Sequence, residues 1–138
     1  MDALSIHRAA HWCYGYNIPV IPKVLQILIF FLFNTYLPYS TKIGRGTRIG
    51  HRGIGVVINS QTVIGENVLI RAHVTIGEKI SDGGSPIIES DVEIGDGAKI
   101  LGKVRVGRGA VIGANAVVLS DVPAGALAVG VPAQIKKR

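Results

Sequence analysis

The sequence predicts an all-β domain, a parallel β-helix built from six-residue repeats, preceded by a short helical segment. Three observations predict this fold. From Lys42 onward an apolar residue returns every six positions. Of the 18 glycines, 17 lie between Gly44 and Gly130, and all eight aromatic residues lie before Ser40. A narrow coil has no room for aromatic rings, so the chain divides into two segments near position 40.

The repeat consists of two apolar columns. The first column contains Ile58, Ile64, Ile70, Ile76, Ile88, Ile94, Ile100, Val106, Ile112 and Val118. The second stands four positions later and contains Thr62, Val68, Val74, Ile80, Val92, Ala98, Val104, Ala110, Ala116 and Val122. Only Asp82 interrupts the first column. A period of six fits neither an isolated helix nor an open sheet and is typical of hexapeptide β-helices, whose corners favour glycine.

The spacing also predicts which residues stack. Three hexads make one triangular coil of about 18 residues, so residues one coil apart should lie about 4.8 Å apart. On this count Ile70, Ile88 and Val106 share one face. The step from Ile49 to Ile58 is nine residues, so three extra residues lie within positions 50–57. Counting hexads then places two histidines, His51 and His73, at outward positions of one face, one coil apart.

Residues 1–39 are predicted to form a helical segment that caps one end of the coil, because a solenoid's terminal strands need covering. Lys23–Leu37 is apolar and stands between Pro22 and Pro38, which suit the start and the end of a helix. A second, shorter helix is expected in residues 6–16, ended by Gly15. Residues 40–130 are predicted to form the β-helix, and residues 131–138 a basic tail.

Two interpretations of residues 23–37 stay open. The helix packs on the rest of the protein or on a sister subunit, or it lies in a membrane interface with the help of Lys23 and the aromatic residues. A transmembrane span is disfavoured, because the uninterrupted apolar run of residues 27–33 has seven residues where a span needs about 20. No signal peptide is recognisable, so we expect a cytoplasmic protein, with peripheral contact at the inner face of the membrane as the alternative.

Charge and cysteine content exclude several classes of protein. The net charge is +6, which favours an anionic partner. Nucleic acid is not expected, because the basic residues are dispersed and no aromatic residues alternate with them as stacking platforms. The single cysteine, Cys13, excludes an internal disulfide framework and a multi-cysteine zinc site. No metal cofactor is expected.

The repeat closely resembles the hexapeptide-repeat acyltransferases, and within them the serine acetyltransferase branch, especially its short members of polysaccharide loci. The matching segments are IGDGAKILG at 94–102, IGANAVVLSDVP at 112–123 and VGVPAQI at 129–135. The resemblance implies a left-handed coil, a homotrimer and an O-acetyltransferase that uses acetyl-CoA in a groove between subunits. It assigns the CoA groove to Gly77, Ala98, Ala114 and Gly130, and the attraction of the nucleotide phosphates to Lys136.

The resemblance also implies the catalytic residues. The serine enzymes carry an Asp-His pair before a G-I-V-V-like strand, and the corresponding stretch here is HRGIGVV at 51–57. Without a gap the pair falls on His51-Arg52; with one inserted residue its histidine falls on His51, and the extra residues counted above favour this placement. Histidine can take the acceptor's proton near pH 7. His51 is therefore the first candidate for the general base and His73 the second.

The acceptor is a hydroxyl of serine or of a sugar. The family's Arg-His-Pro element is represented here by Gly84-Ser85-Pro86, so the arginine expected to hold a substrate carboxylate is missing. Arg52, Asp82 and Ser85 are candidates for binding the acceptor. For Asp82 and Ser85, simple turn formation is the alternative. The second hypothesis for the whole protein is an inactive β-helix with a binding or structural role.

Overall fold

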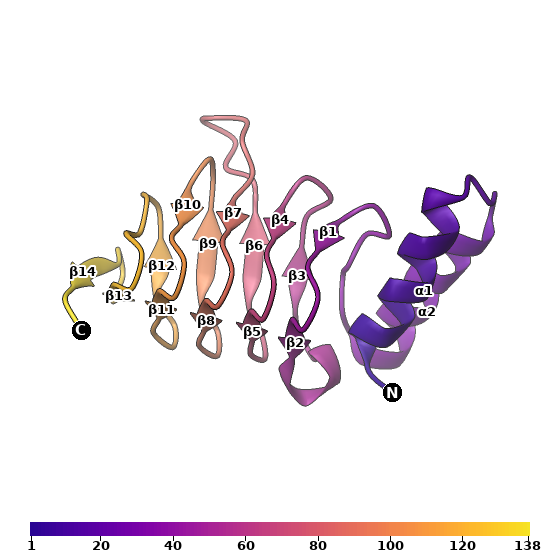
Figure 1. Ribbon diagram of the computed structural model, residues 1–138, viewed down its shortest axis with the longest axis horizontal. Helices are drawn as coiled ribbons and strands as arrows, with labels where there is room; N and C mark the ends of the chain where they lie inside the picture. The colour runs from indigo at the N-terminus through magenta and orange to yellow at the C-terminus, as the bar shows by residue number, and fades with distance from the viewer.

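The computed structural model describes all of residues 1–138 as a left-handed parallel β-helix with two helices at its N-terminal end (Figure 1). The helices are α1 (Ala3–Gly15) and α2 (Ile21–Phe33). The strands of the first coils are β1 (Lys42–Ile43), β2 (Arg48–Ile49), β3 (Val57–Ile58), β4 (Val63–Ile64), β5 (Leu69–Ile70) and β6 (Thr75–Gly77). Those of the later coils are β7 (Ile87–Ile88), β8 (Glu93–Ile94), β9 (Lys99–Leu101), β10 (Arg105–Val106), β11 (Val111–Ile112), β12 (Val117–Val118), β13 (Leu127–Val129) and β14 (Gln134–Lys136).

The strands form the three faces of a triangular coil. Sheet 1 has the order β1-β4-β7-β10, and sheet 3 has the order β3-β6-β9-β12. Sheet 2 contains β2, β5, β8, β11 and β13 in parallel, and β14 adds to β13 in the antiparallel sense. The chain runs from sheet 1 to sheet 2 to sheet 3 in each coil. We call the corner between sheets 2 and 3 the 2–3 corner, and the corner between sheets 3 and 1 the 3–1 corner.

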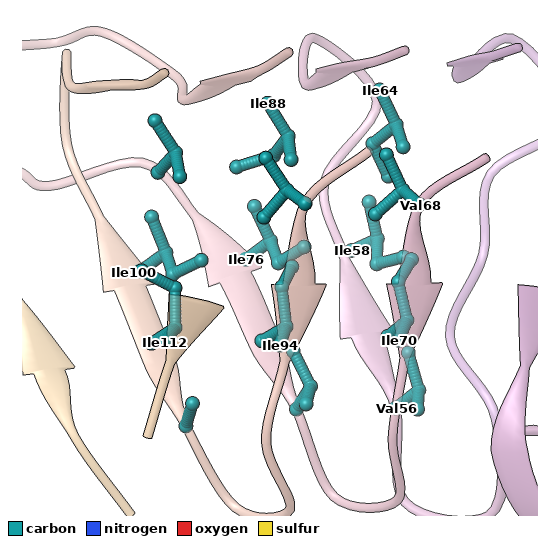
Figure 2. Packing of buried hydrophobic residues seen from close by; sticks show 14 of the residues in the cluster. Val56, Ile58, Ile64, Val68, Ile70, Ile76, Ile88, Ile94, Ile100 and Ile112 are labelled. Carbon is teal, nitrogen blue, oxygen red and sulfur yellow. The ribbon is translucent and has the colours of Figure 1, made fainter. Parts of the chain in front are cut away.

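The predicted apolar columns form the core. The inward isoleucines of the strands are buried and stack in rows from coil to coil, as Figure 2 shows for Ile58, Ile76 and Ile100. The second column, with Val68 and Val74, fills the corners between these rows. Short aliphatic side chains therefore exclude water from the whole length of the coil, which is the main stabilising contribution to such a fold.

One part of the predicted register is wrong. Ile70 pairs with Ile94 rather than with Ile88, and Ile88 lies in sheet 1 beside Ile64. The cause is the segment between β6 and β7, which contains Asp82. It is a loop that leaves the coil, so it cannot be counted as a hexad (Figure 1). Ile80, which the count places in an inward column, is fully exposed in this loop.

The other count is confirmed. Ile49 pairs with Ile70 and Ile58 pairs with Ile76, so nine residues on one coil match six on the next. The three extra residues are accommodated by a turn, η1 (Gly50–Gly53), that projects from the 2–3 corner of the first coil. Figure 1 shows this turn below β2 and β3, to the left of the helices.

The two helices pack against each other, and α1 also contacts β2 and η1 of the first coil. Ile29 and Leu37 are fully buried in the apolar cluster. Asp2 caps α1 by accepting a hydrogen bond from the backbone N–H of Ser5 (2.9 Å). α2 begins with a proline in its first turn and ends at Phe33, four residues before the predicted end, because Asn34 adopts the left-handed conformation. Neither helix has the length and apolar run that spanning a bilayer requires.

The C-terminal tail folds back on the last coil. β14 pairs with β13, with Ala128 opposite Ile135, and so satisfies one strand edge of the terminal coil. The Arg138 guanidinium donates a hydrogen bond to the Gly109 carbonyl oxygen (3.1 Å). The two ends of the solenoid are thus finished by different means, helices at one and an antiparallel strand at the other.

Candidate active site

His51 stands on the projecting turn at the 2–3 corner. Its backbone is left-handed (φ 48°, ψ 39°), as is that of Arg52 (φ 62°, ψ 6°), and both side chains are exposed. The turn is fastened to the segment after α2. The Thr35 hydroxyl donates to the Gly53 carbonyl oxygen (2.6 Å), and the Gly55 N–H donates to the Asn34 carbonyl oxygen (2.9 Å). The inserted residues are thus held in a defined position.

A pocket of about 290 Å³ opens beside His51. One wall is the C-terminal end of α2 and the other is the projecting turn. The lining residues are Phe31, Leu32, Phe33, Asn34, His51, Arg52 and Ile54. The α2 residues of this wall were not predicted to belong to the site. Their position at the end of the helix that caps the same coil appears only in three dimensions. The pocket combines a titratable imidazole, a guanidinium and an apolar wall.

His73 lies at the same 2–3 corner, one coil further on, as the hexad count predicts. Its backbone N–H donates to the Ile54 carbonyl oxygen (3.0 Å), and its φ is positive at 58°. Its ring lies against Gly55, where a Cβ atom would overlap the imidazole. Gly55 is therefore the residue of the preceding coil that contacts His73, and His51 lies on the projecting turn.

Lys99 is a corner residue that the sequence analysis missed. Its ammonium donates to the carbonyl oxygens of Gly97 (2.7 Å) and His73 (3.4 Å), which fixes a positive charge beside the backbone of the second candidate base. The repeat shows that Lys99 begins a strand directly after a corner, but its two carbonyl contacts appear only in three dimensions.

The residues assigned to the CoA groove divide between corners. Ala114 and Gly130 are exposed and lie on adjacent coils of the 2–3 corner, because Ile112 pairs with Ala128. Gly77 ends β6 at the 3–1 corner. Ala98 contradicts its assignment: it is fully buried, its N–H donates to Gly95 and its carbonyl accepts from Thr75, so no atom of it is free to line a groove. It belongs to the inward column of small core residues.

Asp82 and Ser85 lie on the loop at the 3–1 corner. The Asp82 carboxylate accepts hydrogen bonds from the backbone N–H groups of Gly84 (3.1 Å) and Lys103 (3.3 Å). These bonds, aided by the ammonium groups of Lys79 and Lys103, lower the pKa of the exposed carboxyl below its ordinary value. The Ser85 hydroxyl accepts from the Asn59 side-chain amide (2.7 Å). Both side chains shape the loop, which is the turn-forming alternative, and both remain on its accessible side.

Within one chain the predicted site residues form two groups. His51, Arg52, His73, Ala114 and Gly130 follow the 2–3 corner, whereas Gly77, Asp82 and Ser85 follow the 3–1 corner. A strand of sheet 3 separates them, and the four residue-to-residue steps from His73 to Gly77 span about 13 Å. Lys136 lies apart from both groups, exposed on β14. No group of three or more His, Cys, Asp or Glu side chains is placed to hold a metal ion.

Comparison with known proteins places the fold and the corner geometry in a family. The sequence matches the family described as bacterial transferase hexapeptide (six repeats) over residues 40–78 and 85–120, more than half of the chain. This chain belongs to the bacterial hexapeptide-repeat transferases. The β-helix and its glycine-rich corners are therefore features of a transferase scaffold.

Within the hexapeptide-repeat transferases, the chain is similar to serine acetyltransferases. It is 42% identical over 136 residues to that of Helicobacter pylori, covering 97% of this chain and 79% of the relative. It is 38% identical to that of Synechococcus elongatus, of which it spans 55%. The structure of Brucella abortus serine acetyltransferase in complex with coenzyme A aligns with a TM-score of 0.91 at 35% identity, covering 98% of this chain and 54% of that one. The chain thus spans little more than half the length of two of these three proteins.

Proposed function

We propose that the chain is an O-acetyltransferase that uses acetyl-CoA and takes a hydroxyl as acceptor. The observation that carries the proposal is the placement of His51, an exposed imidazole on a fastened turn at the mouth of a pocket in a hexapeptide-repeat transferase. The similarity to serine acetyltransferases, one of them solved with coenzyme A, supports acetyl-CoA as the donor.

In the proposed reaction the His51 imidazole removes the proton of the acceptor hydroxyl as its oxygen attacks the thioester carbonyl of acetyl-CoA. The carbon–sulfur bond breaks when the tetrahedral intermediate collapses, and the imidazolium returns the proton to the thiolate. The products are an acetyl ester and CoA. Nothing in this step requires a metal ion, because the imidazole handles the proton and the thiolate is a good leaving group.

The corner geometry supports a shared site between subunits. The 2–3 corner carries both histidines, and the 3–1 corner carries the loop with Asp82 and Ser85, about 13 Å away in the same chain. In a homotrimer the 2–3 corner of one subunit can face the 3–1 corner of the next, so that the loop completes the pocket beside the histidines. CoA would then follow the 2–3 corner past Ala114 and Gly130.

Serine is the first acceptor to test, because the similar curated proteins are serine acetyltransferases. A sugar hydroxyl is the second. One observation favours it. The loop between β6 and β7 carries Lys79 and contacts Lys103, but it contains no arginine that could pair with an amino acid's carboxylate. The pocket's own cation, Arg52, stands beside aromatic side chains instead.

The experiment that tests the proposal measures thiol release from acetyl-CoA with free serine and with a panel of sugars and nucleotide sugars. We expect release to depend on one class of acceptor. Release with serine identifies Arg52 as the candidate partner of the carboxylate, and release with a sugar alone assigns the pocket to carbohydrate. Tight CoA binding without release on any acceptor of the panel would favour the inactive β-helix and contradict the proposal.

A further inference from the structure

α2 leaves an apolar surface uncovered, although it packs on α1 and buries Pro22 and Ile29. We call its exposed apolar side chains the α2 face. They are Ile21, Val24, Ile27, Leu28, Phe30, Phe31 and Leu32. Their exposed fractions run from 41% to 78%, and the only charged residue of the helix is Lys23. A face of this kind marks an interaction site rather than a solvated surface.

The charge of the chain is concentrated at the same end. Residues 1–65 contain six basic residues and one acidic residue, a net charge of +5, whereas residues 66–138 contain nine basic and eight acidic residues, a net charge of +1. The basic residues of the first part are Arg8, Lys23, Lys42, Arg45, Arg48 and Arg52, and all are exposed. Its one acidic residue, Asp2, is engaged in capping α1.

Ion pairs sharpen this asymmetry. The three salt bridges of the chain join Arg71 to Glu93, Arg105 to Glu89 and Arg108 to Asp91. All of them lie within residues 71–108, so three of the nine cations of residues 66–138 have an acidic partner. None of the six cations near the helices has an acidic partner. The helical end of the molecule therefore carries unpaired positive charge, with Lys23 on α2 itself and Arg52 beside Phe31 in the pocket.

We propose that the α2 face docks onto the surface of a membrane that contains anionic lipids, with α2 lying in the plane of the interface. An interfacial helix needs an apolar face, flanking cations for the lipid headgroups, and aromatic residues at the polar boundary. The aromatic residues are present, because Trp12, Tyr14 and Tyr16 are exposed at the end of α1. The 13 residues of α2 extend over about 20 Å, which suits a helix that lies along a membrane.

The docking face is continuous with the pocket beside His51. Phe31 lines that pocket, and it also lines a second, mostly apolar hollow of about 430 Å³ with Ile27, Phe30 and Tyr36. A bilayer in contact with the α2 face would therefore lie next to the mouth of the His51 pocket. Acceptors displayed at the membrane surface would then be near the imidazole.

The experiment measures cosedimentation of the full chain with vesicles of phosphatidylcholine alone and of phosphatidylcholine with phosphatidylglycerol, at low and at high salt. We expect binding to the anionic vesicles that weakens with salt. The variant with Val24→Asp and Leu28→Asp should bind at least about tenfold more weakly, because it places two carboxylates in the interface. Lys23→Glu should weaken binding about fivefold or more.

Matched controls lie at the 3–1 corner. Ile80→Asp replaces a fully exposed apolar residue of the loop between β6 and β7, and Lys103→Glu replaces an exposed cation next to that loop, both outside the α2 face. Both variants should bind like the parent. The absence of binding to anionic vesicles overturns the proposal, as does binding that the double α2 variant retains. Light scattering is recorded without vesicles. An oligomer that the double α2 variant loses, in a chain that binds no vesicles, assigns the face to a second copy and also overturns the proposal.

Discussion

At the scale of single residues, removal of the His51 imidazole should separate acetyl transfer from acetyl-CoA binding. We expect His51→Ala to lower kcat about 100-fold or more, because the acceptor's proton loses its base. The Kd for acetyl-CoA should change little, since Ala114 lies about three coils, roughly 14 Å, from the projecting turn. Thiol release and calorimetry measure the two quantities. Undiminished kcat in His51→Ala, with a loss in His73→Ala, would move the role to His73.

Gly55 controls the position of the second histidine. Its φ is +69°, and a Cβ would overlap the His73 ring. Gly55→Ala should therefore lower the free energy of unfolding by more than the left-handed backbone alone costs, which is about 1 kcal/mol, and should shift the NMR signals of the His73 ring. Gly83→Ala is the matched control, because its φ is +63° with open space around it. Equal effects of the two substitutions would show that the ring does not rest on Gly55.

His7 makes the stability of the helical cap depend on pH. Its Nε2–H donates to the Pro38 carbonyl oxygen (3.1 Å), and its buried Nδ1 has no partner. Burial, with the neighbouring His11 and Arg8, lowers the pKa of His7 from 6.5 to about 4. The unfolded chain therefore takes up this proton at a higher pH than the folded chain. The contribution of neutral His7 to the free energy of unfolding is complete above pH 6.5. It is lost as the pH falls toward 4, by up to about 3 kcal/mol.

Urea unfolding between pH 7 and pH 4.5 checks this linkage. The parent should lose stability across that range more steeply than His7→Leu, which cannot be protonated at position 7. The same slope in both chains would contradict the burial of a neutral imidazole beneath Pro38.

The residues of the site could be predicted only in part. The shared corner of His51 and His73 could be predicted, because a nine-residue step in a six-residue pattern shows in the sequence. Ala98 was assigned to the groove because small residues occur both in grooves and in cores. The residue type alone does not show whether the side chain points inward or outward. Lys99 was missed because its contacts are to backbone carbonyls, which no sequence pattern reports.

At the scale of elements, the helices were predictable from prolines and apolar runs, but their packing was not. α2 has apolar residues on nearly every side, so its buried side, with Ile29, cannot be told from its exposed side by sequence. The register failed at one place for a physical reason. The step from Ile76 to Ile88 is twelve residues, the length of two hexads. Only the departure of this segment from the coil shows that Ile70 stacks on Ile94.

The packing of α2 gives a prediction with an internal control. Ile29 is fully buried in the apolar cluster, whereas Ile27 is 48% exposed on the α2 face. Ile29→Ala should lower the free energy of unfolding by about 2–5 kcal/mol through lost burial and a cavity. Ile27→Ala should change it by less than about 0.5 kcal/mol. Chemical denaturation of both variants measures the difference, and similar losses would show that the helix presents another side to the coil.

At the scale of the whole molecule, the two corners predict an oligomer. His73 and the loop residues lie at opposite ends of a sheet 3 strand, so a complete site requires a neighbouring subunit. We expect light scattering to give three times the chain mass of 14.6 kDa. We also expect an inactive His51→Ala chain mixed with an inactive chain altered in the loop to recover part of the activity. Full activity in a monomer would contradict a shared site.

The measurement that tests the central claim most directly is acetyl ester formation, followed by mass spectrometry, from acetyl-CoA and the acceptor panel with parent and His51→Ala chains. The account predicts an ester on one hydroxyl acceptor, formed with stoichiometric release of CoA and nearly abolished in His51→Ala. An ester formed equally well by both chains, or CoA bound without any ester, would contradict the assignment of acetyl transfer to the pocket beside His51.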